Sequence, residues 1–259
     1  MSVRQLLDLT GRVALVTGGS RGLGLQIAEA LGEMGARVAI TARKPDELED
    51  ARAGLAKMNV EALPIACDLS DAAAIPGMVE KTVTGLGPID ILVNNAGTTW
   101  GADMVDYPME QWQRVLQLNL TAMFAATQEV GRRCMIPRRR GRIVNIASIL
   151  GLIASNDVAR PGTIAYNTSK GGVISFTRAL AAEWARHDIN VNAIAPGFFP
   201  TKMTRGLLKL LGERAASKAP LNRVGGPEDL KGAALLLASD AGSFITGQVI
   251  AVDGGATAI

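Results

Sequence analysis

The chain has 259 residues, of which 48% are hydrophobic and 20% charged, so it can bury a large core and is not expected to be disordered. The 27 Lys and Arg against 24 Asp and Glu leave a net charge of +3. No segment is dominated by basic residues, and we therefore expect no nucleic-acid partner. Apolar runs are shorter than the roughly 18 residues of a membrane span, and the N-terminus lacks a signal-peptide pattern, so the expected location is the cytoplasm, away from membranes.

Histidine and cysteine usage narrows the chemistry. Cys67 and Cys134 are far apart in the sequence, so no metal or redox pair is expected and a reducing cytoplasm fits. The single histidine, His187, lies in a polar helix-to-strand junction, where a surface role is expected. If the protein is an enzyme, its proton donor is therefore predicted not to be histidine, and no metal site is predicted.

Short runs rich in Val, Ile and Leu alternate with helix-like segments. The runs predict strands at 12–18, 36–41, 61–67, 89–95, 141–148, 189–195 and 248–254. The clearest helical segments are predicted at 23–34, 46–58, 109–135 and 163–186. Continuous apolar runs indicate strands buried on both faces, and helices between them require crossover connections. We therefore predict one α/β domain over residues 1–259, with a seven-stranded parallel sheet covered by helices on both faces.

One region interrupts the alternation. Residues 197–226 are too many for an ordinary connection. Large apolar residues lie there between glycines and prolines: Phe198, Phe199, Leu207, Leu208, Leu210 and Leu211. Long insertions of this kind are often binding loops, and we predict a substrate lid.

A glycine-rich loop, TGGSRGLG (17–24), follows the first predicted strand and begins the first predicted helix. Gly18, Gly22 and Gly24 would let the backbone turn sharply and approach a pyrophosphate at the positive helix N-terminus. Their spacing is G-x-x-x-G-x-G rather than G-x-G-x-x-G. Taken alone, the loop indicates nucleotide binding, with a purely structural turn as the alternative.

The residues after the second strand bear on the choice of cofactor. An acidic residue there would accept a hydrogen bond from an NAD ribose hydroxyl, whereas this chain has Ala42 and Arg43. Arg21 lies inside the glycine loop. Two guanidinium groups converging on this point would bind a 2′-phosphate. The sequence therefore predicts NADP(H) rather than NAD(H), unless both arginines point to solvent.

Tyr166 and Lys170 lie four residues apart in YNTSK, on one face of a predicted helix. Free tyrosine is a poor base because its pKa is about 10. A neighbouring ammonium group and an oxidised nicotinamide would stabilise the phenolate and lower that pKa. Tyr166 could then exchange a proton with a carbonyl or an alcohol. Ser148, at the end of the fifth strand, could donate a hydrogen bond to the substrate oxygen, or only cap the strand end.

These motifs occur together and in order along nearly the whole chain. The combination resembles the short-chain dehydrogenase/reductase family, through TGGSRGLG, NNAG (94–97), Asn119, Ser148, YNTSK and PG (196–197). The resemblance implies a Rossmann-type sheet of order 3-2-1-4-5-6-7. It also implies hydride transfer between a nicotinamide and a carbonyl or alcohol.

By the same resemblance, Tyr166 matches the catalytic acid/base and Lys170 the residue that tunes it and holds the nicotinamide ribose. Ser148 matches the group that orients the substrate oxygen, and Asn119 the residue that supports a water leading to Lys170. For the cofactor, the resemblance implies contacts from these residues: Gly18, Ser20, Arg21, Gly22, Leu23, Gly24, Ala42, Arg43, Asp68, Leu69, Asn94, Ala96, Gly97, Ile146, Tyr166, Lys170, Pro196, Gly197 and Thr201.

Substrate choice is left between two closer resemblances, to 3-oxoacyl-[acyl-carrier-protein] reductases and to gluconate 5-dehydrogenases. Apolar residues in the predicted lid favour an acyl thioester over a sugar acid, unless they pack on the core. The predicted substrate contacts are Ser148, Trp100, Phe198, Phe199 and Met203. A nucleotide-sensing protein without turnover is the rival class, which the complete set of catalytic residues opposes. The resemblance also implies a homotetramer.

Overall fold

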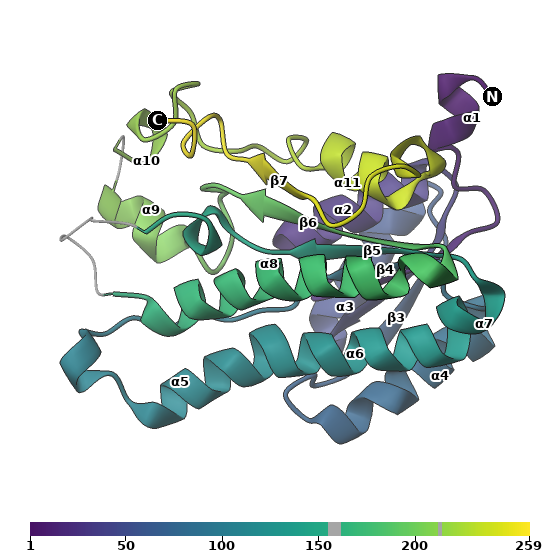
Figure 1. Ribbon diagram of the computed structural model, residues 1–259, viewed down its shortest axis with the longest axis horizontal. Coiled ribbons are helices and arrows are strands. Elements are labelled where there is room, and N and C mark those ends of the chain that lie inside the picture. Colours follow the sequence, from purple (N-terminus) through teal and green to yellow (C-terminus); the bar gives the residue numbers. More distant parts are fainter. Residues whose placement is uncertain (155–161, 212–213) are drawn as a thin grey trace.

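The structure is a computed structural model that describes residues 1–154, 162–211 and 214–259. Seven parallel strands form one sheet in the order β3-β2-β1-β4-β5-β6-β7 (Figure 1). The predicted fold, strand number and strand order are confirmed. The strands are β1 Val13–Thr17, β2 Arg37–Ala42, β3 Ala62–Ala66, β4 Ile91–Asn94, β5 Gly141–Ile146, β6 Ile189–Pro196 and β7 Val249–Val252.

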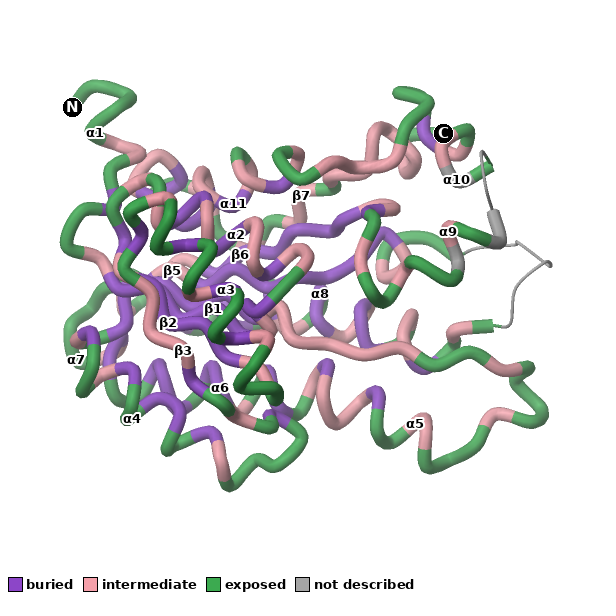
Figure 2. The backbone as a smooth tube through the Cα atoms, turned by 180° about the vertical axis from the view of Figure 1, so that it is seen from behind, coloured by how far each residue is buried: buried purple, intermediate pink, exposed green. Residues whose placement is uncertain are grey.

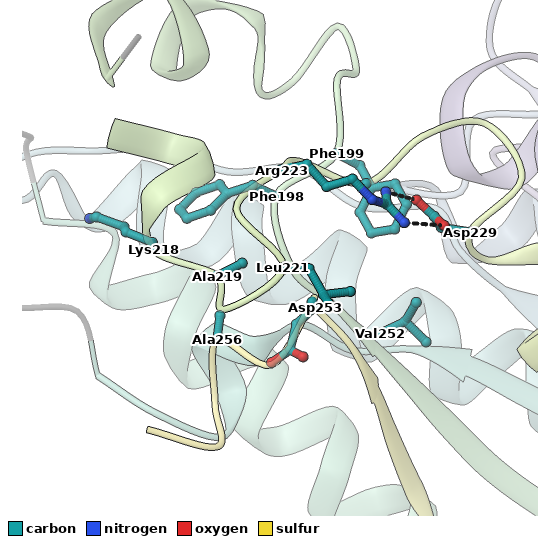
Figure 3. A pocket seen from close by; sticks show the side chains of 12 residues that line it. Phe198, Phe199, Lys218, Ala219, Leu221, Arg223, Asp229, Val252, Asp253 and Ala256 are labelled. Carbon is teal, nitrogen blue, oxygen red and sulfur yellow. Dashed lines mark hydrogen bonds and ion pairs between the residues drawn. The ribbon is translucent and has the colours of Figure 1, made fainter. Parts of the chain in front are cut away.

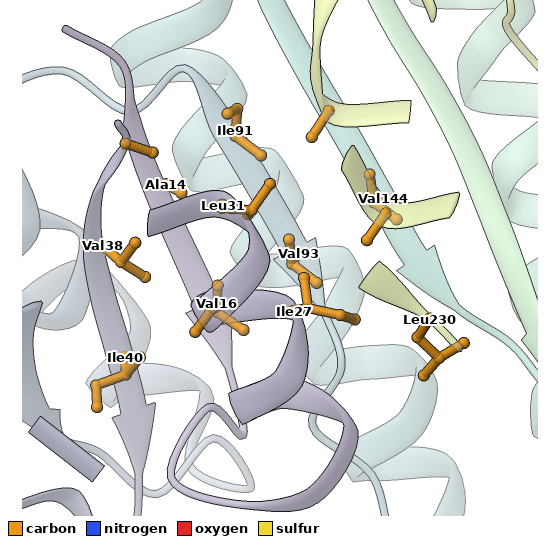
Figure 4. Close-up of a cluster of buried hydrophobic side chains, with 14 of the residues drawn as sticks. Ala14, Val16, Ile27, Leu31, Val38, Ile40, Ile91, Val93, Val144 and Leu230 are labelled. Atoms are coloured by element: carbon orange, nitrogen blue, oxygen red, sulfur yellow. The ribbon is translucent and has the colours of Figure 1, made fainter. Parts of the chain in front are cut away.

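Helices cover both faces of this sheet, because its central strands are apolar on both sides. In β1, Ala14 and Val16 pack in one buried cluster with Ile27 and Leu31 of helix α2 (Figure 4). The intervening residues of β1 belong to a second cluster on the opposite face. One face is covered by α2 (Gly22–Glu33), α3 (Pro45–Lys57) and α11 (Lys231–Ala238), the other by α4 (Ile75–Leu86), α6 (Ala122–Val130) and α8 (Ile164–Trp184). The buried strands lie at the centre of Figure 2.

The segment predicted as one helix over 109–135 follows a helical path that two π-helical turns interrupt. It consists of α5 Met109–Leu116, a π turn at Gln117–Thr121, α6, a second π turn at Gly131–Met135 and α7 Ile136–Arg138. Such π turns are frequent at functional sites, and the first contains Asn119.

The remaining elements are short. Residues 197–226 carry α9 (Arg205–Leu211) and α10 (Arg214–Ser217), and α1 (Val3–Leu7) precedes β1. Short 3-10 helices occur at Ala72–Ala74, Met104–Asp106, Ile149–Gly151, Ala185–His187 and Asp240–Gly242. Within the described ranges, no helix combines the length and the apolar character needed to cross a bilayer.

Candidate active site

The candidate residues gather at the carboxyl edge of the sheet. In open parallel α/β sheets, ligands bind outside this edge. The glycine loop follows β1, Arg43 follows β2, and Ser148 follows β5, while Tyr166 and Lys170 come from the first turns of α8. Strand topology therefore brings together residues that are more than a hundred positions apart.

The loop between β1 and α2 requires its glycines. Gly18 and Gly22 have φ angles of 64° and 55°, a region that side chains other than glycine rarely occupy. A Cβ atom at Gly24 would overlap both the carbonyl oxygen of Gly18 and Nδ2 of Asn95. No side chain caps the N-terminus of α2 and no acidic residue lies in its first turn. The loop therefore presents backbone N–H groups as a pyrophosphate site requires.

Asn95, which the sequence analysis did not select, holds this loop in place. Its Nδ2 donates to the carbonyl oxygens of Thr17 at 2.9 Å and Gly18 at 3.0 Å. In return, the hydroxyl oxygen of Thr17 accepts from the backbone N–H groups of Asn95 and Ala96. The signal in the sequence was a second asparagine directly after an apolar strand.

Gly24→Ala is expected to lose at least about tenfold in NADPH affinity, because the added methyl group would push the loop away from its observed path. Fluorescence titration of purified protein with NADPH would measure the loss. Gly54→Ala is the matched control, since a Cβ there meets nothing within 4 Å and alanine favours the helix. Equal affinities for the two variants would contradict the role of Gly24.

Asn94, expected among the cofactor contacts, turns its side chain into the protein interior instead. It is 6% exposed, and its Nδ2 donates to Thr127 Oγ1 and to Asn145 Oδ1, both at 2.9 Å. The next amide in this chain, Asn145 Nδ2, donates to Thr177 Oγ1 of α8 at 2.9 Å. The Asn94 side chain thus belongs to an interior polar ladder that links β4, β5 and α8.

The positive groups expected after β2 have acidic partners. Arg21 forms an ion pair with Glu47 in the first turn of α3. Arg43 is exposed and acts on Asp68, which was expected among the cofactor contacts. Hydrogen bonds from Ser70 and, to a smaller extent, the charge of Arg43 lower the pKa of Asp68. The two guanidinium groups therefore interact with different carboxylates.

Ser148, Tyr166 and Lys170 form the centre of the site. The ammonium nitrogen of Lys170 lies 5.6 Å from the centroid of the Tyr166 ring and donates to the carbonyl oxygen of Ile146 at 2.6 Å. Ser148 lies near enough to Tyr166 for its hydroxyl to lower the pKa of the tyrosine. Ser148 also caps the following 3-10 helix by accepting from the Leu150 N–H at 3.1 Å. Both sequence-based interpretations of Ser148 are therefore compatible with its position.

Burial controls the pKa values of this pair. Tyr166 is only partly exposed, and desolvation raises its pKa more than the Ser148 hydroxyl lowers it. Lys170 is 5% exposed, and burial lowers its pKa to about 8. The protein groups alone thus move the Tyr166 pKa opposite to the expected direction. Lys170 does not offset this effect, so a lowered tyrosine pKa would require a further cation at the site.

Asn119 is buried beside Lys170 and is fixed on several sides. Its Oδ1 accepts from the Thr98 N–H at 2.8 Å, and its Nδ2 donates to the Thr98 carbonyl and to Ser169 Oγ. Ser169 Oγ in turn donates to the Tyr166 carbonyl at 2.7 Å. A Cβ at Gly97 would lie 3.2 Å from Asn119 Oδ1 and 3.8 Å from Lys170 Nζ. Ser169, which lies within YNTSK but was not selected, thus links the asparagine to the catalytic helix.

Residues after β6 connect the site to the 197–226 segment. Gly197 donates its N–H to the Val252 carbonyl at 3.0 Å, which places it beside the end of β7. Thr201 lies against the glycine loop, because a Cβ at Gly22 would be 3.5 Å from its methyl carbon. These contacts bring residues 197 and 201 to the same edge as the loop.

The expected substrate contacts differ in how exposed their side chains are. Phe199 is 2% exposed and packs in the core with Leu230, so it is not available as an open binding surface. Phe198 and the edge of Phe199 both line a pocket between residues 218–225 and the end of β7, and no catalytic candidate lines that pocket (Figure 3). Trp100 and Met203 are exposed. The side chain of Leu207 lies outside the described residues.

Titratable groups elsewhere suggest no competing centre. Among the residues that the structure describes, no group of three His, Cys, Asp or Glu side chains could hold a metal ion. Desolvation raises the pKa of both thiols, Cys67 and Cys134.

A parallel sheet with a glycine loop and a Tyr–Lys pair at its carboxyl edge defines a nucleotide-dependent oxidoreductase of the α/β class. A family model of the short-chain type, described as enoyl-(acyl carrier protein) reductase, matches residues 18–257. The chain belongs to the short-chain dehydrogenase/reductase family and is an oxidoreductase of that family.

Its relatives divide between two substrate classes. The chain is 39% identical to a gluconate 5-dehydrogenase of Gluconobacter oxydans over 99% of both chains. It is 40% identical to a rhamnolipid-biosynthesis 3-oxoacyl-[acyl-carrier-protein] reductase of Pseudomonas aeruginosa, over 96% of this chain and 97% of the relative. A solved gluconate 5-dehydrogenase of Burkholderia cenocepacia, in complex with NADP and tartrate, superposes with a TM-score of 0.92 and 33% identity over all of both chains.

Proposed function

We propose that this oxidoreductase reduces a 3-oxoacyl thioester to the 3-hydroxyacyl thioester with NADPH. The observation that carries the substrate class is the apolar character of the segments flanking the catalytic groups. Leu152 and Ile153 follow Ser148 closely, and Ile164 lies two residues before Tyr166, at the start of α8; all three are 40–41% exposed. Large apolar side chains left exposed near catalytic groups favour an apolar ligand. An acyl chain fits them better than a polyol.

NADP(H) is the cofactor of this enzyme. The uncapped N-terminus of α2 and the glycines that keep its approach open fit a pyrophosphate. Arg21 and Arg43 fit a 2′-phosphate at the end of β2. A similar solved structure in complex with NADP supports this assignment. When bound, the cofactor supplies the hydride.

The protein groups supply the proton and the orientation. The raised pKa keeps the Tyr166 hydroxyl protonated at neutral pH, so it can donate its proton to the substrate carbonyl oxygen as that oxygen becomes negative. Ser148, whose hydroxyl lies near Tyr166, donates to the same oxygen and fixes its position. Lys170 supplies positive charge beside the tyrosine ring, and Asn119 holds the turn around Lys170.

Oxidation of a sugar acid or polyol is the second candidate. The similarity to gluconate 5-dehydrogenase extends over 99% of the chain, and the same Ser148–Tyr166 pair would serve in the reverse direction, with the tyrosine accepting a proton. Residues 197–226 would then select a polar substrate.

Segment 197–226 acts as the substrate lid in this proposal.

We also propose that the protein is a cytoplasmic homotetramer. The tetramer is supported by Phe124 of α6 and Phe176 of α8, whose rings meet edge-to-face at 6.3 Å. Phe124 is 50% exposed, so the helices at 109–135 and 164–184 carry an apolar surface that a second copy would cover.

The test is NADPH consumption by the purified enzyme with acetoacetyl-coenzyme A and, separately, with 5-keto-D-gluconate. We expect kcat/KM for the thioester to exceed that for the sugar acid by at least about tenfold, the factor that a difference of 1.4 kcal/mol in transition-state binding gives. The reverse order would replace the proposal with the second candidate. If NADPH were oxidised with neither substrate, both substrate assignments would be refuted.

A further inference from the structure

Four charged side chains meet where β2 connects to α3. The carboxylate of Glu47 forms ion pairs with Arg21, with Lys44 at 3.5 Å and with Lys202 at 3.7 Å. Arg21 comes from the glycine loop, Lys44 from the N-terminus of α3 and Lys202 from segment 197–226. One carboxylate therefore gathers cations from three separate parts of the chain.

The cluster lies at the place where a dinucleotide-binding fold distinguishes its cofactors. The N–H of Gly19 donates to the Thr41 carbonyl at 3.1 Å, so the glycine loop rests on the end of β2. In such folds, residues at this strand end lie at the 2′ position of the adenosine ribose. A carboxylate here can accept from a 2′-hydroxyl, whereas a 2′-phosphate needs cations.

We propose that Glu47 is a specificity-determining residue that competes with the 2′-phosphate of NADP(H) for Arg21, Lys44 and Lys202. The inference rests on the proposed cofactor. The doubly charged phosphate must displace or approach the carboxylate, and the like charges repel each other. NAD(H) carries no charge at this position and meets no such repulsion. Glu47 thus keeps the preference for NADP(H) below the level that the cations alone would give.

Lys202 adds a consequence for the predicted lid. It lies next to Thr201, which contacts the glycine loop at Gly22. When the phosphate replaces Glu47 as the partner of these cations, Lys202 connects segment 197–226 directly to the cofactor. All three cationic side chains are largely exposed and can reorient towards a ligand, while Glu47 is the most enclosed member of the cluster.

The experiment compares Glu47→Gln with wild type in binding titrations of NADP⁺ and NAD⁺, using the full chain without substrate. Glutamine keeps the shape and removes the charge. We expect NADP⁺ to bind about fivefold to tenfold more tightly and NAD⁺ to change by less than about twofold. Glu49→Gln is the matched control, because it removes the same charge from the same helix at a residue paired with Arg52; both affinities should stay within about twofold.

Lys202→Gln provides an independent arm, with NADP⁺ affinity expected to fall about threefold to tenfold and NAD⁺ affinity to stay unchanged. If the ratio of NADP⁺ to NAD⁺ affinity in Glu47→Gln equalled that of wild type, the proposal would be overturned. Weaker NADP⁺ binding would overturn it by showing that Glu47 organises the cations. A selective loss of NAD⁺ binding would overturn it by making Glu47 a ribose ligand. If the wild type showed no preference for NADP⁺ over NAD⁺, the proposed cofactor would be contradicted. The role of Glu47 would still be tested, because its effect is measured as the change between Glu47→Gln and wild type.

Discussion

Tyr166→Phe is expected to lower kcat by about 100-fold to 10,000-fold, the range that a positioned general acid contributes. The phenyl ring keeps the volume of the tyrosine, so the packing around α8 and the glycine loop 17–24 should be unchanged. NADPH affinity is therefore expected to stay within about threefold of wild type, less than the tenfold that a 1.4 kcal/mol change produces. Stopped-flow or steady-state absorbance measures turnover, and fluorescence titration measures binding.

Tyr107→Phe is the natural control, because the chain has only two tyrosines. The Tyr107 hydroxyl donates to the Trp100 carbonyl at 3.2 Å, outside the Ser148–Tyr166–Lys170 group. Its removal should cost about 1 kcal/mol of stability at most and leave kcat within about threefold. Turnover preserved in Tyr166→Phe, or lost equally in both variants, would remove Tyr166 from the mechanism.

Lys170→Met is expected to lower kcat by at least about 100-fold and to change how stability depends on pH. The native pKa of about 8 lies below the ordinary value of 10.5. Below pH 8 both states are protonated and the folded state bears the desolvation cost of the charge. Between pH 8 and 10.5 the unfolded state binds more protons, so the free energy of unfolding of the wild type rises with pH, by on the order of 3 kcal/mol.

Methionine cannot titrate, so the variant lacks this rise. Its stability relative to wild type should therefore fall by on the order of 3 kcal/mol between pH 7 and pH 10.5. Urea unfolding at several pH values measures the difference, with the exposed Lys57→Met as the control that should run parallel to wild type. Parallel curves for Lys170→Met would show that the buried lysine is not desolvated as the structure indicates.

The sheet could be predicted from sequence because its central strands, such as β1 and β4, are buried on both faces and leave continuous apolar runs. Helix α4 was not among the predicted helices, although its apolar residues lie at helical spacing. Ile75, Met78, Val79 and Leu86 are buried on its sheet-facing side. The short helices α9 and α10 were not predictable, because helices of a few residues depend on tertiary contacts rather than on their own sequence.

The site shows a different limit. Motifs identify which residues gather at the sheet edge, because strand ends place them there. They do not say which of two adjacent side chains faces the ligand: Asn94 turns inward and Asn95 holds the loop. In the same way, Phe199 is buried in the core while Phe198 beside it is half-buried, although both line one pocket. These choices depend on backbone direction, which a local sequence pattern does not encode. The ion pair between Arg21 and Glu47 likewise joins the glycine loop to the first turn of α3.

The polar ladder Asn94–Asn145–Thr177 has a consequence for redesigning the enzyme. Each member donates to the next, and Thr177 ends the chain on the Val173 carbonyl. Replacing one member by an apolar residue leaves its neighbour's donor or acceptor buried and unpaired, which costs more than the hydrogen bond contributed. Directed-evolution libraries should therefore exchange these three positions together rather than one at a time.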